Sequence, residues 1–227
     1  MGWTGSSSRG SESLRMLETR RLRLLAATLS GVAGFVDAVG WLTSGGLFVS
    51  FMSGNTTKLG IGIAGQLDNA VLAVGLLSCF VAGVVLGSLA GRAAPGRQQA
   101  VVMWLVTAMM TAAAGLQQLG LLQPAVLVLA ATMGALNTVF AENGEVKFGL
   151  TYMTGALVRV GKRLAGAIRG GDPWGWVSSF SLFMGMLTGA VLGALCHALT
   201  GAQALWGAVA ALGMLALVAG RLGRPDG

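Results

Sequence analysis

The stretch FMSGNTTKLG at residues 51–60 recurs as YMTGALVRVG at residues 152–161, and this recurrence decides the fold. Both copies carry an aromatic residue, a methionine, a small hydroxyl residue and a glycine in the same order. Upstream, GFVD at 34–37 recurs as GALN at 134–137. The copies are separated by about 100 to 102 residues, which indicates an internal duplication. Duplicated membrane proteins commonly bind their substrate where the two halves meet.

A glycine spacing of four residues also recurs in both halves. The glycines are Gly83, Gly87 and Gly91 in the first half and Gly185, Gly189 and Gly193 in the second. Each set lies on one face of a helix, where small residues let helix backbones pack closely in lipid. The pattern predicts a helix-packing face. It suits a sliding interface between the halves, static close packing, or a homodimer contact.

The composition is that of a membrane protein. Of 227 residues, 54% are hydrophobic and only 10% are charged, with a mean hydropathy of +0.74. Residues 71–91, 98–141 and 173–220 contain no Asp, Glu, Lys or Arg, and stretches of about 20 apolar residues match the ~30 Å hydrocarbon core. The net charge of +7 comes from basic residues in the N-terminal arm, the short loops and the C-terminal end. Cytoplasmic flanks have this distribution, whereas nucleic-acid binding would need basic and aromatic residues interleaved on one face.

Eight apolar segments can be drawn, four in each half. Their bounds are 22–42, 47–65, 69–91, 99–119, 123–141, 148–168, 174–197 and 203–221. The second segment of each half is rich in Ser, Thr, Gly and basic residues, which suits a broken or re-entrant segment buried in protein. If all eight segments crossed, Arg92 and Arg97 would lie outside, against the positive-inside rule.

The basic loops instead fit six crossing segments. If the two odd segments are broken or return, the basic residues at 92–97, 159–169 and 221–224 share the inner side with the N-terminal arm. We therefore expect an all-α membrane protein with about six transmembrane helices, arranged as an inverted 3+3 repeat with two broken or re-entrant segments. It would be a multi-pass protein of a bacterial inner membrane with both termini cytoplasmic. The expected divisions are an arm at 1–21, repeats at 22–119 and 120–222, and a tail at 223–227.

Asp37 is the acidic residue in the middle of an unambiguous span, and its repeat partner is Asn137. An acid at this depth must face a partner or water. One interpretation is proton or cation coupling, or contact with the substrate. The other is a structural hydrogen bond that pins the neighbouring broken segment. In both, we expect Asp37 to face the bundle interior and to contact the break at 53–57.

Residues 53–57 have the chemistry of a helix start inside the membrane. We expect Ser53 or Asn55 to cap the helix and Gly54 to adopt an unusual backbone angle. A free helix start at this depth attracts anions or dipoles. The alternative is a re-entrant turn without a ligand.

Lys58 and Arg159 occupy equivalent positions in the two copies. Arg159 fits a cytoplasmic flank, whereas Lys58 would pair with Asp37 or attract an anionic solute. The candidate substrate-binding residues are therefore Asp37, Ser53, Gly54, Asn55, Thr56, Lys58, Asn137, Thr154, Gly155 and Arg159. The sequence has no nucleophile–base arrangement, P-loop or zinc motif, so we predict no catalytic set, no metal site and no cofactor.

Residues 34–38, GFVDA, and 45–56, GGLFVSFMSGNT, resemble the signature of the YoaK-like family. This is a group of bacterial integral membrane proteins classed as a domain of unknown function. The family usually has Met-Thr-Gly-Asn, where this chain has Ser53 in place of Thr. The resemblance implies a polytopic inner-membrane protein and implies no substrate.

The duplication and its polar breaks predict a secondary transporter or channel-like permease for a small polar or anionic solute, and not an enzyme. The alternative is a membrane scaffold or accessory subunit whose polar breaks are purely structural. The expected partners are the lipid bilayer and an unidentified small solute, with no nucleic acid. A homo-oligomer stays open as a further alternative.

Overall fold

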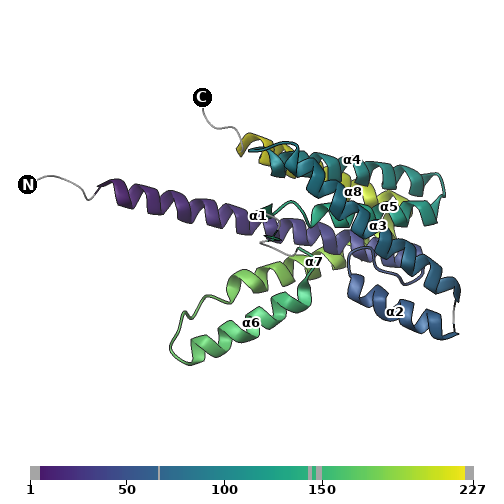
Figure 1. The fold of residues 1–227 in the computed structure, drawn as a ribbon, viewed down its shortest axis with the longest axis horizontal. Coiled ribbons are helices and arrows are strands. Elements are labelled where there is room, and N and C mark those ends of the chain that lie inside the picture. Colours follow the sequence, from purple (N-terminus) through teal and green to yellow (C-terminus); the bar gives the residue numbers. More distant parts are fainter. Residues whose placement is uncertain (1–5, 66, 143–144, 147–149, 223–227) are drawn as a thin grey trace, which may run out of the picture.

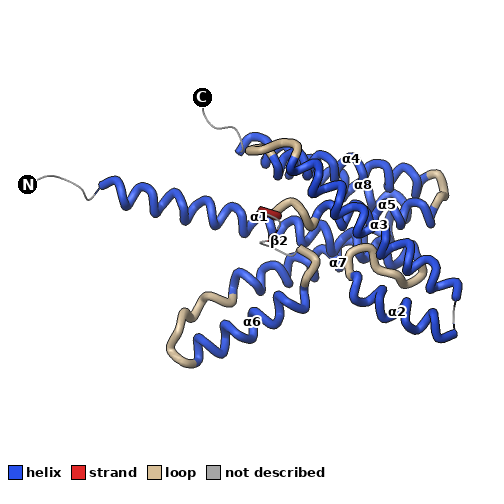
Figure 2. Tube along the Cα trace, in the orientation of Figure 1, coloured by secondary structure: helices blue, strands red, loops and turns tan. Residues whose placement is uncertain are grey.

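The computed structural model describes residues 6–65, 67–142, 145–146 and 150–222 (Figure 1). This part is helical apart from its loops and two very short strands (Figure 2). The helices are α1 Ser6–Ser44, α2 Met52–Gly65, α3 Leu67–Arg92, α4 Gln98–Gln118, α5 Leu122–Leu136, α6 Met153–Ile168, α7 Val177–Thr200, the single turn η1 Gly201–Gln203, and α8 Ala204–Leu222. Strands β1 Ala141–Glu142 and β2 Glu145–Val146 pair in antiparallel fashion. The expected all-α class is confirmed, with this strand pair added.

Helix α1 is longer than the predicted first span. Its 39 residues extend over about 58 Å at 1.5 Å per residue, well beyond the ~30 Å hydrocarbon core. Residues 6–21 of the predicted arm therefore continue the first span as one helix. Residues 1–5 of the arm and the predicted tail at 223–227 lie outside the described residues.

Four helical stretches in the described chain are long and apolar enough to cross a membrane, judged by length and composition. They are 21–44, 70–92, 98–118 and 177–220. The last is 44 residues long because α7 and α8 follow each other through η1. Helix α5 is also apolar but has only 15 residues. It ends before the predicted position 141 because Asn137 takes the C-cap position and donates its side-chain amide to the Met133 carbonyl at 2.9 Å.

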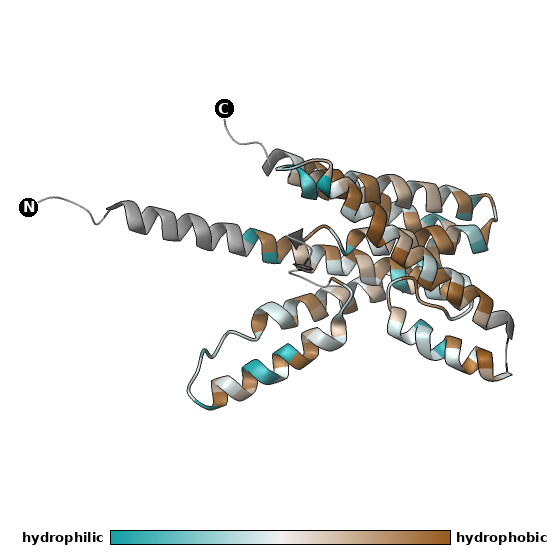
Figure 3. Cartoon of the chain, in the orientation of Figure 1, coloured by the Kyte–Doolittle hydropathy of each residue, from teal (hydrophilic) through white to brown (hydrophobic). Residues whose placement is uncertain are grey.

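The second segment of each half is a short helix that begins about five residues later than predicted. Helix α2 has 14 residues and α6 has 16, or about 21 and 24 Å at 1.5 Å per residue. Both begin near the middle of the molecule and run outward to opposite sides (Figure 1). Both short helices carry hydrophilic residues along their length, whereas α3 is mostly hydrophobic (Figure 3). Each short helix is therefore preceded by non-helical chain, as a broken segment requires.

Helices α1 and α7, from different halves of the chain, cross with their backbones in close contact. A side chain at Gly34 would meet the Met186 carbonyl, and one at Gly189 would meet the Gly31 carbonyl, both at less than 3.0 Å. Because a real Cβ atom does not tolerate that distance, only glycine permits this approach of two backbones.

The crossing of α3 and α5 is built in the same way. A side chain at Gly134 would meet the Phe80 carbonyl, and one at Gly83 would meet the Ala131 carbonyl. Gly83 contacts Ala131 as Gly189 contacts Gly31, the residue equivalent to Ala131. Gly83 is therefore equivalent to Gly189, whereas the order of the glycines in the sequence matches it with Gly185, one helical turn earlier. The other predicted packing glycines, Gly87, Gly91, Gly185 and Gly193, also lie against neighbouring residues.

The core lies among α1, α4, α5 and α8, and the outer faces of α3 and α7 stay apolar. The largest fully buried side chains include Leu29, Met103, Met110, Leu129, Met133, Leu136, Leu205 and Leu212. Large apolar side chains are exposed on the outer faces, among them Val81, Leu89, Val191 and Leu199. An exposed apolar surface of this extent suits lipid and not water. The fold is that of an all-α membrane protein.

The loops sort to opposite ends of the bundle. The start of α1, the end of α8 and the loops at 93–97 and 169–176 lie toward one end, on the left of Figure 1. The loop at 119–121 lies at the other end. The loops that carry basic residues therefore share an end with the outermost described turns of α1 and α8.

Candidate functional site

The chain between α1 and α2 folds back against α1 and is tied to Asp37. Gly45 and Gly46 reverse the chain with φ angles of 74° and 111°. Asp37 Oδ1 then accepts the backbone N–H groups of Val49 and Ser50, each at 2.8 Å. Asp37 is 6% exposed, so the prediction that it faces the interior is confirmed. Its partners lie at 49–50, however, and not at 53–57 as expected.

Asn55 holds the same segment from α2. Its Oδ1 accepts the Phe48 N–H at 3.0 Å, and its Nδ2 donates to the Phe48 carbonyl at 2.5 Å. Asn55 is fully buried, and its amide is matched to one backbone residue. Asn55 is therefore a clamp on the preceding segment and not a helix cap.

The expected cap and backbone angle at the start of α2 are wrong. The helix begins at Met52, so Ser53 is already inside its first turn, where it is exposed. Gly54 is helical, and the positive φ angles occur earlier, in the reversal before the helix. Gly54 instead gives space to the Phe51 ring, which a side chain at Gly54 would meet at 2.5 Å.

Lys58 does not pair with Asp37. Its Nζ lies 5.4 Å from the centre of the Phe48 ring, within the range of a cation–π contact. Among the described residues no ion pair joins Lys58 to Asp37, because the Asp37 carboxyl group is engaged by the backbone. The alternative in which Lys58 pairs with Asp37 is wrong, and Lys58 lies half-buried beside the segment that Asn55 holds. Thr56, two residues earlier, is exposed and donates to the Met52 carbonyl of its own helix at 2.9 Å.

The segment before α6 has an equivalent contact among the described residues. Thr151 Oγ1 donates to Asn137 Oδ1 at 3.2 Å. Thr151 occupies the position that Ser50 occupies in the first copy, so the Asp37–Ser50 contact has a counterpart in Asn137–Thr151. The contact is made by a side chain here and by the backbone N–H in the first copy.

The starts of the two short helices also match in backbone hydrogen bonding. Met52 N–H donates to the Ser50 carbonyl at 3.1 Å, and Met153 N–H donates to the Thr151 carbonyl at 3.0 Å. In the second copy, the Tyr152 ring lies over Gly155 as the aromatic ring at 51 lies over Gly54. The two copies of the quoted motif therefore form the same local structure.

The remaining candidates of the second half lie on α6. Thr154 is exposed and Arg159 is half-buried. Among the described residues, no hydrogen bond or ion pair joins the candidates of the first half to those of the second. The candidate residues form two clusters, one at the start of each short helix, and the described chain contains no group of three or more His, Cys, Asp or Glu that suits a metal ion.

Ser30 is a contact residue that the sequence pattern does not single out. Its Oγ lies 3.0 Å from both the Leu150 and the Leu182 carbonyl oxygens, which joins α1 to the segment before α6 and to α7. Ser30 is fully buried. In the sequence, Ser30 stands out only as a hydroxyl residue beside Gly31 in an apolar span. The repeat does not point to it, because the equivalent residue is Ala130.

Comparison with known proteins places the chain in a family. Residues 25–218 match the family described as protein of unknown function, DUF1275. The chain is 35% identical over 199 residues to the UPF0700 transmembrane protein RA0705 of Rhizobium meliloti (strain 1021), an alignment that covers 85% of this chain and 84% of that protein. No solved structure matches the chain significantly. The chain belongs to the DUF1275 family of proteins, as its YoaK-like signature predicts.

Proposed function

We propose that the protein is a secondary transporter or channel-like permease, and not an enzyme, for a small polar or anionic solute. One observation carries this proposal: α2 and α6 are too short to cross a membrane, and both begin near the middle of the molecule. Each begins at an equivalent polar segment. Interrupted helices of this kind form the substrate sites of many transporters, because their free ends meet near the midplane of the bilayer.

The proposed architecture is an inverted 3+3 repeat, with α1, α3 and α4 in one half and α5, α7 and α8 in the other. The helix contacts support it: α1 packs on α7, and their equivalents in the other half, α5 and α3, also pack on each other. The equivalent helices α4 and α8 pack on each other. There, Thr107 Cγ2 lies 3.9 Å from the position of a Cβ atom on Gly213. Three crossings per half would place the halves in opposite orientations.

The proposed topology has both termini in the cytoplasm of a bacterial cell and six crossings of the inner membrane. The arrangement of the basic loops supports it, because those at 93–97 and 169–176 lie toward the end of the bundle where α1 starts and α8 ends. The loop at 119–121 has no basic residue and lies at the opposite end. This is the asymmetry that the positive-inside rule describes.

In this proposal the residues divide into two roles. Ser53 and Thr154 are exposed hydroxyl residues at the starts of α2 and α6, and they would contact the solute. Lys58 and Arg159, also at equivalent positions, would attract an anionic group. Asp37 and the other buried polar residues would position the segments that end at the short helices.

A specific observation favours the alternative of a membrane scaffold. The Asp37 and Asn55 side chains both bond to the backbone of the segment before α2. Their polar atoms are therefore used by the fold and not offered to a solute. A scaffold needs the breaks to be rigid, whereas a transporter also needs the exposed hydroxyls at 53 and 154.

Osmotic flux in proteoliposomes separates the two proposals. Urea, and the potassium salts of formate and nitrate with valinomycin present, would serve as probes, with light scattering as the readout. Transport predicts flux of at least one probe above that of protein-free liposomes, reduced several-fold in Ser53→Val/Thr154→Val. Thr188→Val is the matched control, because Thr188 is an exposed hydroxyl residue on α7, outside α2, α6 and the segments before them. Flux at the protein-free level for every probe, from folded protein, would favour the scaffold.

A further inference from the structure

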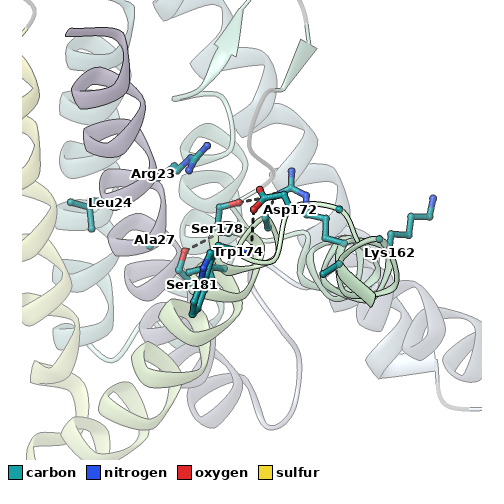
Figure 4. Close-up of a pocket in the computed structure, with 14 residues that line it drawn as sticks. Arg23, Leu24, Ala27, Lys162, Asp172, Trp174, Ser178 and Ser181 are labelled. Atoms are coloured by element: carbon teal, nitrogen blue, oxygen red, sulfur yellow. Dashed lines mark hydrogen bonds between the residues drawn. The ribbon is translucent and has the colours of Figure 1, made fainter. Parts of the chain in front are cut away.

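A cavity lies where α1 meets α6 and the loop between α6 and α7 (Figure 4). Its volume is about 870 Å³, and its lining includes none of the candidate residues at the two breaks. Three cationic side chains line it, Arg23, Lys162 and Arg163, against one acidic side chain, Asp172. The cavity therefore carries an excess of two positive charges.

Two of the three cations have no partner within the described chain. Arg23 and Lys162 are exposed and make no hydrogen bond or ion pair with other described residues. In Figure 4 the Arg23 side chain points from α1 toward the loop, while Lys162 lies on the far side of α6 and extends away from Arg23 and Asp172. Cations that line a concave site without a counter-ion attract an anion.

The third cation is held in place by the loop and by α7. Arg163 Nη1 donates to the Gly175 carbonyl and, at 2.9 Å, to Ser178 Oγ. These bonds fix one edge of the guanidinium group, and a fixed guanidinium suits a phosphate oxygen better than a mobile one. Ser178 accepts this bond, so its own hydroxyl proton is free for a ligand oxygen.

The acidic residue of the cavity serves the loop. Asp172 Oδ1 accepts the Trp174 N–H at 3.0 Å, which shapes the turn that begins at Pro173. No ion pair joins Asp172 to a cation among the described residues. Asp172 therefore does not neutralise the cluster by direct contact.

The rim of the cavity is apolar and exposed. Leu24 on α1 is 61% exposed and Trp174 on the loop is 71% exposed. Tryptophan beside basic residues at the end of a membrane bundle is typical of the level of lipid headgroups. A basic pocket between membrane helices, with an apolar rim, is the arrangement that binds an anionic headgroup and its first acyl carbons.

We propose that this cavity binds a phosphate group, and that an anionic phospholipid supplies it. Arg23 and Arg163 contact the phosphate oxygens, Lys162 adds positive charge from the outer side of α6, and Leu24 and Trp174 contact the chain that follows. The volume supports a headgroup as the source, because it exceeds what one inorganic phosphate fills and lies within the range of small-molecule sites.

The test uses the purified full-length protein in nanodiscs. Binding of phosphatidylglycerol is compared with that of phosphatidylcholine by titration, and inorganic phosphate is titrated separately at constant ionic strength. The variant is Arg23→Gln/Lys162→Gln, which is expected to fold because neither side chain has a partner in the described chain. The control is Arg97→Gln, which removes an exposed basic residue in the loop before α4, outside the cavity.

The proposal predicts that the variant binds phosphatidylglycerol about tenfold more weakly than the wild type, while the control keeps wild-type binding. Binding of inorganic phosphate alone, lost in the variant, would keep the phosphate site and overturn the lipid as its source. Equal phosphatidylglycerol binding by variant, control and wild type would overturn the site. So would an equal loss in variant and control.

Discussion

The segments before α2 and α6 derive from the same sequence motif, yet they are held with different strength. Before α2, Asp37 accepts two backbone N–H groups and Asn55 pairs twice with Phe48. Before α6, in the part that the structure describes, Asn137 Oδ1 accepts the Thr151 hydroxyl at 3.2 Å, and the Leu150 carbonyl accepts the Ser30 hydroxyl at 3.0 Å. The position equivalent to Asn55 is an alanine. The two segments share their local fold, while among the described residues more side-chain hydrogen bonds fix the first.

This difference assigns different mechanical roles to the two halves. A segment with four hydrogen bonds to two side chains, two of them buried and two part-buried, has a high cost of opening, because each unpaired buried backbone group costs about 1–3 kcal/mol. Among the described residues, the segment before α6 has two such side-chain hydrogen bonds, with Ser30 and with Asn137, and we expect it to open more easily. If the protein moves during transport, we expect the start of α6 to move and the start of α2 to stay fixed.

Asp37→Ala is expected to have the largest effect on stability. It leaves the Val49 and Ser50 N–H groups without their acceptor in the interior, a loss of about 3 kcal/mol. The apparent melting temperature in detergent measures it. Asp37→Asn is the matched control, because it keeps an acceptor oxygen at the same place, and it should lose much less. Equal losses in the two variants would mean that the charge, and not the tie to the backbone, sets the role of Asp37.

Gly34→Ala and Gly134→Ala are expected to lose similar amounts, about 1–3 kcal/mol each. In both, the added methyl group would press on a carbonyl of the crossing helix. Gly161→Ala is the control, since nothing lies within 4 Å of a Cβ atom there. Melting temperatures of the three variants test whether the crossings are equivalent. Tolerance of one buried position and not of the other would break the equivalence.

Asn55→Ala is expected to lose about 2 kcal/mol, because it removes two hydrogen bonds to the Phe48 backbone. Thr56→Val is the control, as it removes an exposed hydroxyl one residue away. Limited proteolysis at residues 45–51 should become faster in Asn55→Ala and stay unchanged in Thr56→Val. Wild-type proteolysis in Asn55→Ala would show that the clamp is not needed.

Asn137→Ala is expected to have the smallest effect, at most about 1 kcal/mol. It removes the bond to Thr151 and the bond to the Met133 carbonyl at the end of α5. The melting temperatures of Asn137→Ala and Asp37→Ala, measured under the same conditions, compare how much each residue stabilises its segment. A loss as large as that of Asp37→Ala would overturn the claim that the second segment is held lightly.

Much of this fold was predictable from the sequence. The apolar runs predict the helices, and the glycine spacing predicts where helices approach, because both depend on local composition. The interior position of Asp37 followed from the cost of an acid in lipid. Lys58 does not pair with Asp37 because backbone N–H groups already donate hydrogen bonds to the carboxyl group. No sequence pattern marks such backbone donors. Ser30 was missed for the same reason, since its acceptors are two backbone carbonyls from distant segments.

The register of the second glycine set could not be read from spacing. Gly185, Gly189 and Gly193 are all one turn apart, so sequence alone does not tell which of them matches Gly83. The contact with Gly31 decides it. The starts of α2 and α6 were also predicted too early, because the mostly apolar residues at 47–51 suit a helix but lie in non-helical chain fixed from α1 and α2.

Cysteine accessibility tests the inverted repeat most directly. On a Cys79→Ala/Cys196→Ala background, Pro95→Cys and Leu119→Cys each place one thiol on an exposed loop position. An inverted 3+3 repeat with cytoplasmic termini predicts that a membrane-impermeant maleimide labels Leu119→Cys in intact cells. It predicts labelling of Pro95→Cys only after the membrane is opened. Labelling of Pro95→Cys in intact cells, at the rate seen for Leu119→Cys, would contradict the inverted repeat.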